Sequence, residues 1–389
     1  MCALPTAHLQ TLHKIYAGST ELSPFHACYA HEDTVLRSCA GRLFVHDNGD
    51  DMVAAYWALR RKVAIYDVPE RPIEIAGPDA LRLLEKIFAR RIAPLQIGRG
   101  CYVLACTHAG GLFMDGVLFR LEADRFWFVQ PDGDMHTWLL AHNTEFDVTI
   151  SDPKSRALQI QGPLSFRFMR AASDGAIDAS MGCFYAGFFT IGGQQVYVSR
   201  TGWTGELGYE IYTQGECTNA IQLWDHLIEA GAEYDPLFSG MQSMNARRIE
   251  AGILDSGSDF DTSMTPFEAG LDKFIDLEKP GYIGAHALQK VDRQKRLFGV
   301  VCGARTPQRG DSILDGAQRV GTITTGAHSP FLKAGVGYVR FDEGGDWQGR
   351  NLFLVNIIGD LFPCEIVDPP FYDRQKAILK TITGPEDLP

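Results

Sequence analysis

Two stretches of the chain repeat the same order of apolar and polar positions. Residues 63–76 have the extended apolar pattern of a strand, the Gly-Pro pair at 77–78 breaks it, and residues 79–90 continue with apolar side chains at helical spacing. Residues 158–172 repeat that order, Gly-Pro included. The matching cores are Ile73-Glu74-Ile75-Ala76-Gly77-Pro78 and Leu158-Gln159-Ile160-Gln161-Gly162-Pro163. The repetition predicts a duplicated strand–turn–helix unit in an α+β fold and carries no information on function.

The pattern between and after these units predicts further strands and helices. Alternation between turns predicts an antiparallel meander with strands over 101–107, 112–121 and 126–130. Beyond the second unit we expect strands over 188–191, 195–200 and 209–213, helices over 218–230 and 246–254, and a glycine-rich loop over 201–208. From about Leu297 short strands alternate with turns, which is typical of a small all-β barrel or sandwich. We therefore place the main domain boundary near residues 285–297.

Length, composition and charge narrow the class of protein. A chain of 389 residues, 45% hydrophobic and 22% charged, predicts two or three folded domains. The net charge of −12, without any long Lys/Arg block, argues against a nucleic-acid binder. The sequence has no long apolar run and no signal-like start, so neither a membrane span nor secretion is predicted. The nine cysteines are dispersed without a C-x-x-C pair, which favours free thiols and a cytoplasmic location.

Common cofactor and metal motifs are missing from the sequence. It contains no G-x-x-x-x-G-K-[ST], no strand-linked G-x-G-x-x-G and no G-x-S-x-G. The eleven histidines never fall in an H-x-x-x-H spacing, so no metal site is predicted. Nucleotide-binding and metal-dependent classes therefore lack support.

Four segments, taken in order, carry a family signal. They are 102–117 with Gly110-Gly111-Leu112-Phe113-Met114-Asp115, 199–210 with Arg200-Thr201-Gly202-Trp203-Thr204-Gly205-Glu206-Leu207-Gly208-Tyr209-Glu210, 248–271 with Arg248-Ile249-Glu250-Ala251-Gly252, and 321–330. Together they resemble the aminomethyltransferase (glycine-cleavage T-protein) superfamily over about residues 25–373. Residues 98–102, 209–212 and 253–277 are most similar to its dimethylsulfoniopropionate demethylase branch.

The resemblance implies an α+β fold of three domains around a folate channel, the last domain being a β-barrel. On this pattern residues 1–60 with 152–285 form a discontinuous first α+β domain that binds folate. Residues 61–151 form a second α+β domain that contains the meander, and residues 290–389 form the C-terminal β-barrel. The resemblance also implies tetrahydrofolate as the cofactor and one-carbon transfer as the activity.

Glu210 is the residue that the resemblance assigns to the pterin ring. A pterin presents a 2-amino group beside an N–H, and one carboxylate can accept both hydrogen bonds in a planar pair. Strand parity places Tyr212 on the same face as Glu210, and Tyr212 matches an aromatic folate contact of the demethylase branch. The competing interpretation of Glu210 is an ordinary surface carboxylate on a strand.

Asp115 is predicted at the reacting end of the folate, with Val117 close by on the same strand. An acid in an apolar strand is costly unless it is paired or near solvent, and the competing interpretation is an Asp that faces water beside a turn. In aminomethyl transfer the matching Asp lies beside the folate nitrogens. In methyl transfer a carboxylate here would orient N5 and stabilise developing positive charge. T-proteins commonly carry two adjacent acids at this point, and Met114 replaces the first.

Three further residues have two open interpretations each. Tyr102 and Trp203 match ring-contact positions of the demethylase branch. There an aromatic face can hold a sulfonium or quaternary ammonium by cation–π attraction, worth about 2 kcal/mol or more when dry. Both residues also fit ordinary core packing. Gln161 either contacts folate or only turns the chain.

The glutamyl tail of the folate lacks an obvious cation. T-proteins use a further Arg that helps to hold this tail, and Met244 stands at that position here. Arg200 and Arg248 are the remaining candidates for this contact.

These residues favour a tetrahydrofolate-dependent demethylase as the first hypothesis. N5 would attack the methyl carbon of a small methylated donor, sulfonium or betaine-like, because such donors leave as neutral groups and need little acid catalysis. The alternatives are the glycine-cleavage aminomethyltransferase with its lipoyl-bearing carrier protein, a methoxyaromatic O-demethylase, and a non-enzymatic folate-binding protein of iron–sulfur assembly. Met114 and Met244 argue against the aminomethyltransferase. The assembly protein would need a K-G-C-Y type motif, and residues 278–285 contain no Cys.

Overall fold

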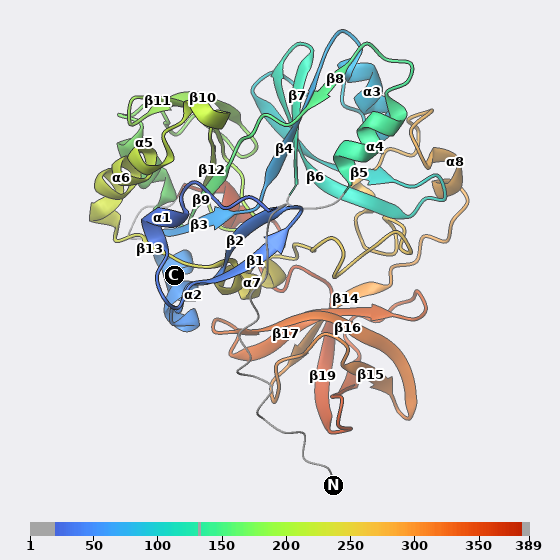
Figure 1. Cartoon of the computed structure of the whole chain (residues 1–389). Helices are drawn as coiled ribbons and strands as arrows, with labels where there is room; N and C mark the ends of the chain where they lie inside the picture. The colour runs from blue at the N-terminus through green and yellow to red at the C-terminus, as the bar shows by residue number, and fades with distance from the viewer. Residues whose placement is uncertain (1–19, 131–133, 383–389) are drawn as a thin grey trace.

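The computed structural model describes residues 20–130 and 134–382. Its main elements form two open sheets, each with helices on one side, and a closed barrel (Figure 1). The barrel is built from the orange and red part of the chain and lies at one end of the molecule, below the sheets in Figure 1. The mixed α+β class with a C-terminal barrel is therefore confirmed.

The first sheet has six strands, and its helices cover one face. Its order is β10 (Ala186–Ile191), β11 (Gln194–Ser199), β12 (Gly208–Tyr212), β9 (Ala157–Gln161), β3 (Ala64–Val68), β13 (Leu237–Phe238). Helices α1 (His26–Tyr29), α5 (Ser165–Ala172) and α6 (Ala220–Gly231) pack on this face. Buried apolar side chains such as Leu158, Ile160 and Ile211 point from the strands toward these helices.

The second sheet repeats this arrangement with five strands. Its order is β5 (Arg99–Cys106), β6 (Leu112–Glu122), β7 (Arg125–Gln130), β4 (Arg71–Ala76), β8 (Thr149–Ser151), and helices α3 (Ala80–Ile87) and α4 (Met135–His142) pack on one face. The two Gly-Pro units turn alike. Gly77 and Gly162 both have positive φ, and a Cβ on either would lie 2.4 Å from a backbone oxygen, so only glycine fits.

The faces of the two sheets that carry no helices meet in a shared core. Tyr197 and Tyr212 of the first sheet form ring contacts with Phe119 and Trp127 of the second sheet, at centroid distances from 5.2 to 6.3 Å. All four side chains are buried. We call these two facing surfaces the inner faces of the sheets.

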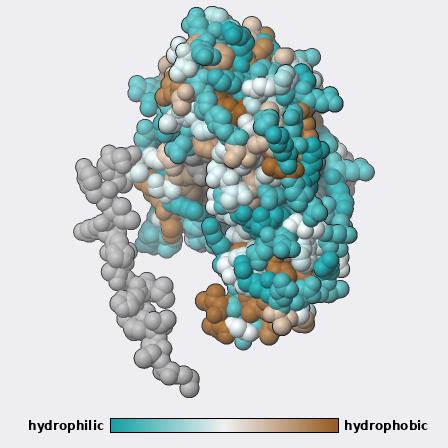
Figure 2. Space-filling model, turned by 90° about the vertical axis from the view of Figure 1, so that its right-hand side faces the viewer, coloured by the Kyte–Doolittle hydropathy of each residue, from teal (hydrophilic) through white to brown (hydrophobic). Residues whose placement is uncertain are grey.

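The C-terminal barrel closes on itself through six antiparallel strands. Its order is β14 (Leu297–Cys302), β17 (Ala334–Phe341), β16 (Gln318–Ser329), β15 (Ser312–Asp315), β18 (Asn351–Val355), β19 (Leu361–Val367), and β19 pairs back with β14. Figure 2 shows a largely hydrophilic face with apolar side chains gathered at the lower end, where the barrel lies. Among the described residues, no helix has the length and apolar character needed to cross a bilayer.

The boundary between the first two domains differs from the predicted one. The chain from 63 to 76 reads as one extended run, but it forms two strands in different sheets, β3 and β4. The change of sheet therefore falls at residues 69–70 instead of 60–61. The remaining elements are β1 (Val35–Cys39), β2 (Arg42–Asp47), α2 (Met52–Arg61), α7 (Met241–Glu250), α8 (Ala285–Leu288) and α9 (Ala377–Lys380), with 3₁₀ turns at Gly215–Cys217, Ala232–Tyr234 and Asp272–Phe274.

A buried carboxylate joins the first domain to the barrel and to the chain after it. Glu250, at the end of α7, accepts hydrogen bonds from Tyr56 of α2 at 2.8 and 3.0 Å, from Ser329 of β16 at 2.5 Å and from Tyr372 at 2.6 Å. Its side chain is fully buried. The nearest cations are Arg60 and Arg247, each 4.0 Å away. Segments far apart in the sequence therefore satisfy one charge.

Candidate functional site

A row of polar side chains lies on the inner face of the first sheet. Successive strand residues point to opposite faces, so Gln159 and Gln161 on β9, Ser199 on β11, and Glu210 and Tyr212 on β12 share the inner face. The register pairs Glu210 with Gln159 on one side and with Ser199 on the other. All five residues are buried. The strand order thus concentrates polar groups in a region that is otherwise apolar.

Glu210 lies at the centre of this row and accepts four side-chain hydrogen bonds. Gln159 Nε2 donates to its Oε1 at 2.9 Å, and Oε2 accepts from Tyr212 at 2.9 Å, Ser199 at 3.3 Å and Thr201. Burial raises the pKa of Glu210, and the hydrogen bonds from Thr201, Tyr212 and Gln159 act in the opposite direction. The residue is therefore an interior acceptor and is not a surface carboxylate.

Glu70, which no sequence pattern predicted as a site residue, is a second buried acid at this point. The Gln159 amide donates one N–H to Glu210 and the other to Glu70 Oε1 at 3.1 Å. Burial raises the pKa of Glu70 to about 8, and the nearby charge of Glu210 contributes. Glu70 Oε2 and Gln159 Oε1 are buried and have no hydrogen-bond partner among the described residues. The sequence did contain a sign of a buried polar site here, because Gln159 and Gln161 lie on the same face of an otherwise apolar strand, which is unusual.

Gln161 holds the glycine-rich loop after β11. Its Oε1 accepts from Thr204 Oγ1 at 2.8 Å, and its Nε2 donates to the carbonyls of Thr201 at 3.1 Å and Tyr209 at 3.4 Å. The amide fits against Gly202 and Gly208, where an added Cβ would lie 2.1 and 2.3 Å from it. Its donors and acceptor are thus used within the protein, which supports the positioning interpretation over a folate contact.

Tyr102, Asp115 and Val117 share the inner face of the second sheet. Tyr102 pairs with Val117 across β5 and β6, and Tyr102 Oη donates to Asp115 Oδ2 at 2.7 Å. Burial and the Asp115 charge raise the pKa of Tyr102 well above its usual value. The Tyr102 ring meets Phe274 edge-on at 4.6 Å. Met114, in contrast, packs in the helix-side core of the same sheet, so its side chain points away from Asp115.

Trp203 packs between the two sheets, and its ring already contacts a cationic side chain. It packs with Val117 in the core that includes Tyr212, and the guanidinium of Arg248 lies 5.0 Å from the centre of its ring. Arg248 in turn binds Asp259 at 2.7 Å. This use of the ring weakens the prediction that Trp203 and Tyr102 form a pair of aromatic walls for a cationic donor, because one ring face is covered.

The arginines considered for the folate tail are engaged elsewhere. Arg200 donates to the carbonyls of Met181 at 2.8 Å and Lys380 at 2.9 Å. Arg248 binds Asp259 at 2.7 Å and Thr325 at 3.0 Å. Met244 is fully buried in the shared core. A tail contact through either arginine would require these hydrogen bonds to break.

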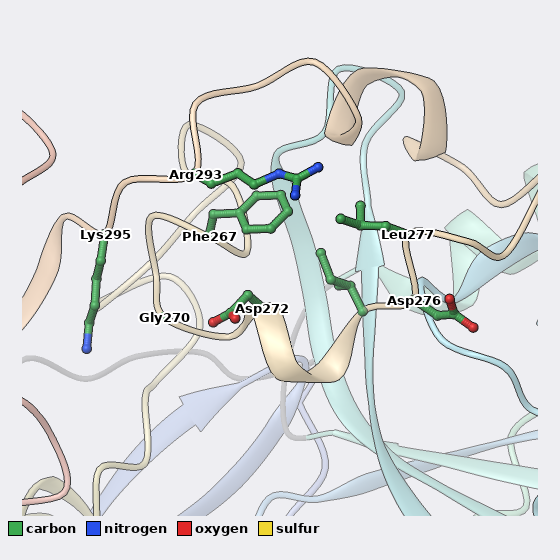
Figure 3. Close-up of a pocket in the computed structure, with 8 residues that line it drawn as sticks. Phe267, Gly270, Asp272, Asp276, Leu277, Arg293 and Lys295 are labelled. Carbon is green, nitrogen blue, oxygen red and sulfur yellow. The ribbon is translucent and has the colours of Figure 1, made fainter.

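Two surface cavities lie apart from the inner faces. One, of about 500 Å³, is drawn in Figure 3, where Arg293 extends over the Phe267 ring at 5.2 Å and Asp272 and Asp276 lie below. The other, of about 440 Å³, is lined mainly by barrel residues and includes Arg296, Arg309 and Arg340. None of the predicted site residues lines either cavity.

Comparison with known proteins gives a consistent assignment. Residues 40–279 match the family described as the GCVT N-terminal domain, and residues 295–373 match the glycine cleavage T-protein C-terminal barrel domain. The chain belongs to the aminomethyltransferase (glycine-cleavage T-protein) family. An aminomethyltransferase of Streptomyces avermitilis is 31% identical over 334 residues, covering 82% of this chain and 89% of that protein. One of Halothermothrix orenii is 30% identical over 336 residues, covering 82% and 91%.

A solved structure supports the same fold. The glycine cleavage system aminomethyltransferase T from Bartonella henselae aligns with a TM-score of 0.82 and 22% identity, covering 92% of this chain and 99% of that one. The superfamily, the fold, the use of tetrahydrofolate and a one-carbon transferase activity are therefore confirmed. The named relatives are aminomethyltransferases, so that alternative has more support than the sulfonium or betaine demethylase.

The inner-face residues fit a pterin. A pterin needs buried acceptors for its N–H groups, and the first sheet offers the Glu210 carboxylate with the unpartnered Gln159 Oε1 beside it. Buried polar atoms without partners are rare in folded proteins, and a ligand is one of their ordinary explanations.

Proposed function

We propose that the chain transfers the one-carbon unit of an aminomethyl group from a lipoyl-bearing carrier protein to tetrahydrofolate, which forms methylenetetrahydrofolate and releases ammonia and the reduced lipoyl thiol. The observation that carries this proposal is the buried acceptor set around Glu210, facing Tyr102 and Asp115 across the inner faces, in a chain of this family. Met114 points into the core behind the second sheet, so the missing first acid does not alter the face that carries Asp115. The cytoplasmic location stays a prediction.

Each residue of the proposed site has a distinct part. Glu210 accepts N–H groups of the pterin, and Gln159 and Tyr212 fix the orientation of its carboxylate through bonds of 2.9 Å each. Asp115 supplies negative charge next to the reacting nitrogens, and Tyr102 orients that carboxylate at 2.7 Å. Val117 and Trp203 pack beside Tyr212 and exclude water. Tetrahydrofolate, when bound, supplies the nucleophilic nitrogen.

Methyl transfer from a small methylated cation is the second candidate. The Tyr102 hydroxyl binds the Asp115 carboxylate and the Tyr102 ring meets Phe274 edge-on, and an aromatic ring next to a negative charge suits a sulfonium or quaternary ammonium. Residues 253–277, which include Phe274, are one of the three segments that resemble the dimethylsulfoniopropionate demethylase branch. This candidate needs no carrier protein.

Product analysis separates the two candidates. The protein is incubated anaerobically with tetrahydrofolate and, in separate reactions, an aminomethyl-loaded lipoyl carrier, dimethylsulfoniopropionate, glycine betaine or vanillate. We expect methylenetetrahydrofolate and ammonia from the carrier only, and 5-methyltetrahydrofolate from none of the small donors.

Methyl product from a sulfonium or betaine would overturn the first candidate in favour of the second, and methyl product from vanillate would indicate an O-demethylase. Folate binding without turnover of any donor would favour a non-enzymatic assembly protein. The Asp115→Asn variant is the matched control, since it keeps the size of the side chain and removes the charge.

A further inference from the structure

The buried pair Glu70 and Glu210 has an unusual electrostatic position. Both side chains are at least nine-tenths buried, and one amide, that of Gln159, donates to both carboxyl groups. Neither acid forms an ion pair anywhere in the described ranges 20–130 and 134–382. Two uncompensated buried charges joined by a single amide are strongly disfavoured, so the pair retains one proton at neutral pH.

The hydrogen bonds indicate which acid holds the proton. Glu210 accepts four donors, which favour its ionised form. Glu70 has a single side-chain donor, the Gln159 amide at its Oε1, and its Oε2 is the atom without a partner. Glu70 is therefore the neutral acid, with its proton on Oε2.

The groups around Glu70 agree with this placement. Arg42 of β2 donates Nη1 to the Glu70 backbone carbonyl at 2.6 Å, so it does not pair with the carboxyl group. Glu210 of β12 and Asp67 of β3 raise the pKa of Glu70, Arg42 lowers it, and burial has the largest effect, which brings the value to about 8.

We propose that Glu70 is a specificity-determining residue of this site, where its carboxyl O–H donates to an acceptor of the bound pterin while the Gln159 carbonyl accepts a pterin N–H. This assignment rests on the proposed folate-binding function. Glu210 alone offers only acceptors, whereas the Glu70–Gln159 pair adds one donor and one acceptor. The combination selects a neutral heterocycle that carries both kinds of group, as a pterin does.

The assignment makes folate affinity depend on pH in a defined direction. Ionisation of Glu70 removes the donor and adds a second buried negative charge. The wild-type dissociation constant for tetrahydrofolate should therefore be constant at pH 6.5–7.5 and rise about tenfold per pH unit above about 8. Calorimetry under anaerobic, reducing conditions measures it without any donor.

Two variants and a control separate this role from a structural one. Glu70→Gln keeps an acceptor for Gln159 and places an N–H at the Oε2 position, so its affinity should stay within about threefold of wild type and lose the pH dependence. Glu70→Ala should weaken binding on the order of 10- to 100-fold at pH 7. Asp67→Asn alters the buried acid on β3 whose hydroxyl partner is Tyr29, on the helix side of the sheet. It should keep the loss of folate affinity at high pH, with the onset at a slightly lower pH because the Asp67 charge that helps to raise the pKa of Glu70 is removed.

The outcomes distinguish this assignment from the proposed function. A flat wild-type profile, a pH-dependent profile in Glu70→Gln, or a loss of affinity in Glu70→Gln as large as in Glu70→Ala would each overturn the role of Glu70 alone. Absence of tetrahydrofolate binding by the wild-type protein at every pH would overturn the proposed function, and the role of Glu70 with it.

Discussion

Replacing Gln161 by Leu tests whether this residue positions the loop or contacts the folate. Leu has a similar size and removes three hydrogen bonds, to Thr204, Thr201 and Tyr209. At roughly 0.5–1.5 kcal/mol for each bond, and less for the 3.4 Å contact, the loss is about 1–4 kcal/mol. For a domain of about 150–250 residues this lowers the thermal midpoint by roughly 2–16 °C.

The assay is thermal unfolding of the ligand-free protein, followed by calorimetric titration with tetrahydrofolate. We expect a large loss of stability before any ligand is added, and a smaller loss of affinity because Thr201, which Gln161 holds, donates to Glu210. Gln159→Leu is the matched variant, two residues away on the same face and equally buried; it removes two hydrogen bonds to buried carboxyl groups and should lower both stability and affinity. Unchanged stability of Gln161→Leu together with weakened folate binding would refute the positioning role.

Three further predictions concern single residues. Glu210→Gln should weaken tetrahydrofolate binding by about 1.5–3 kcal/mol, because an amide donor would face the pterin N–H groups; unchanged affinity in calorimetry would remove Glu210 from the pterin site. Asp115→Asn should lower kcat on the order of 10²-fold with little change in folate affinity, and turnover within about twofold of wild type would exclude this charge from the reaction. Burial raises the pKa of Asp67 from 3.8 to about 6, so the folded state holds this proton more tightly than the unfolded chain. The associated stability, about 3 kcal/mol, is complete below pH about 4 and lost as the pH rises to about 6. Asp67→Asn should flatten that part of the stability profile, and an identical slope in the variant would contradict it.

Local patterns predicted much of the fold. The strand and helix of each Gly-Pro unit and the strands of the meander lie where their pattern placed them, because these signals depend on neighbouring residues only. Closure of the barrel could not be read in this way. It depends on pairing of β19 with β14, and nothing in a short window distinguishes that pairing from a sandwich.

The site was only partly predictable for a similar reason. Parity placed Tyr212 beside Glu210, and the structure has Tyr212 donating to that carboxylate at 2.9 Å. Glu70 could not be predicted from the pattern because it lies where the chain passes from one sheet to the other, within residues 63–76, whose pattern is that of a single strand. The Arg248 contact with Trp203 joins a helix to a distant loop, so no spacing rule could reveal it.

The bonds to Glu250 have a consequence for how the protein matures. Tyr372, which donates to this carboxylate, is among the last described residues to be synthesised, while Tyr56 is among the first. A growing chain that has completed α7 must therefore carry Glu250 without two of its three hydroxyl partners until the barrel and the segment after it are made. With one hydroxyl donor in place of three, the buried carboxylate is less well compensated, so the packing around Glu250 is completed only when the barrel and the segment after it are made. The segment that carries Tyr372 therefore ties the barrel side of the molecule to Glu250, and nonsense changes that remove it should leave a less stable protein.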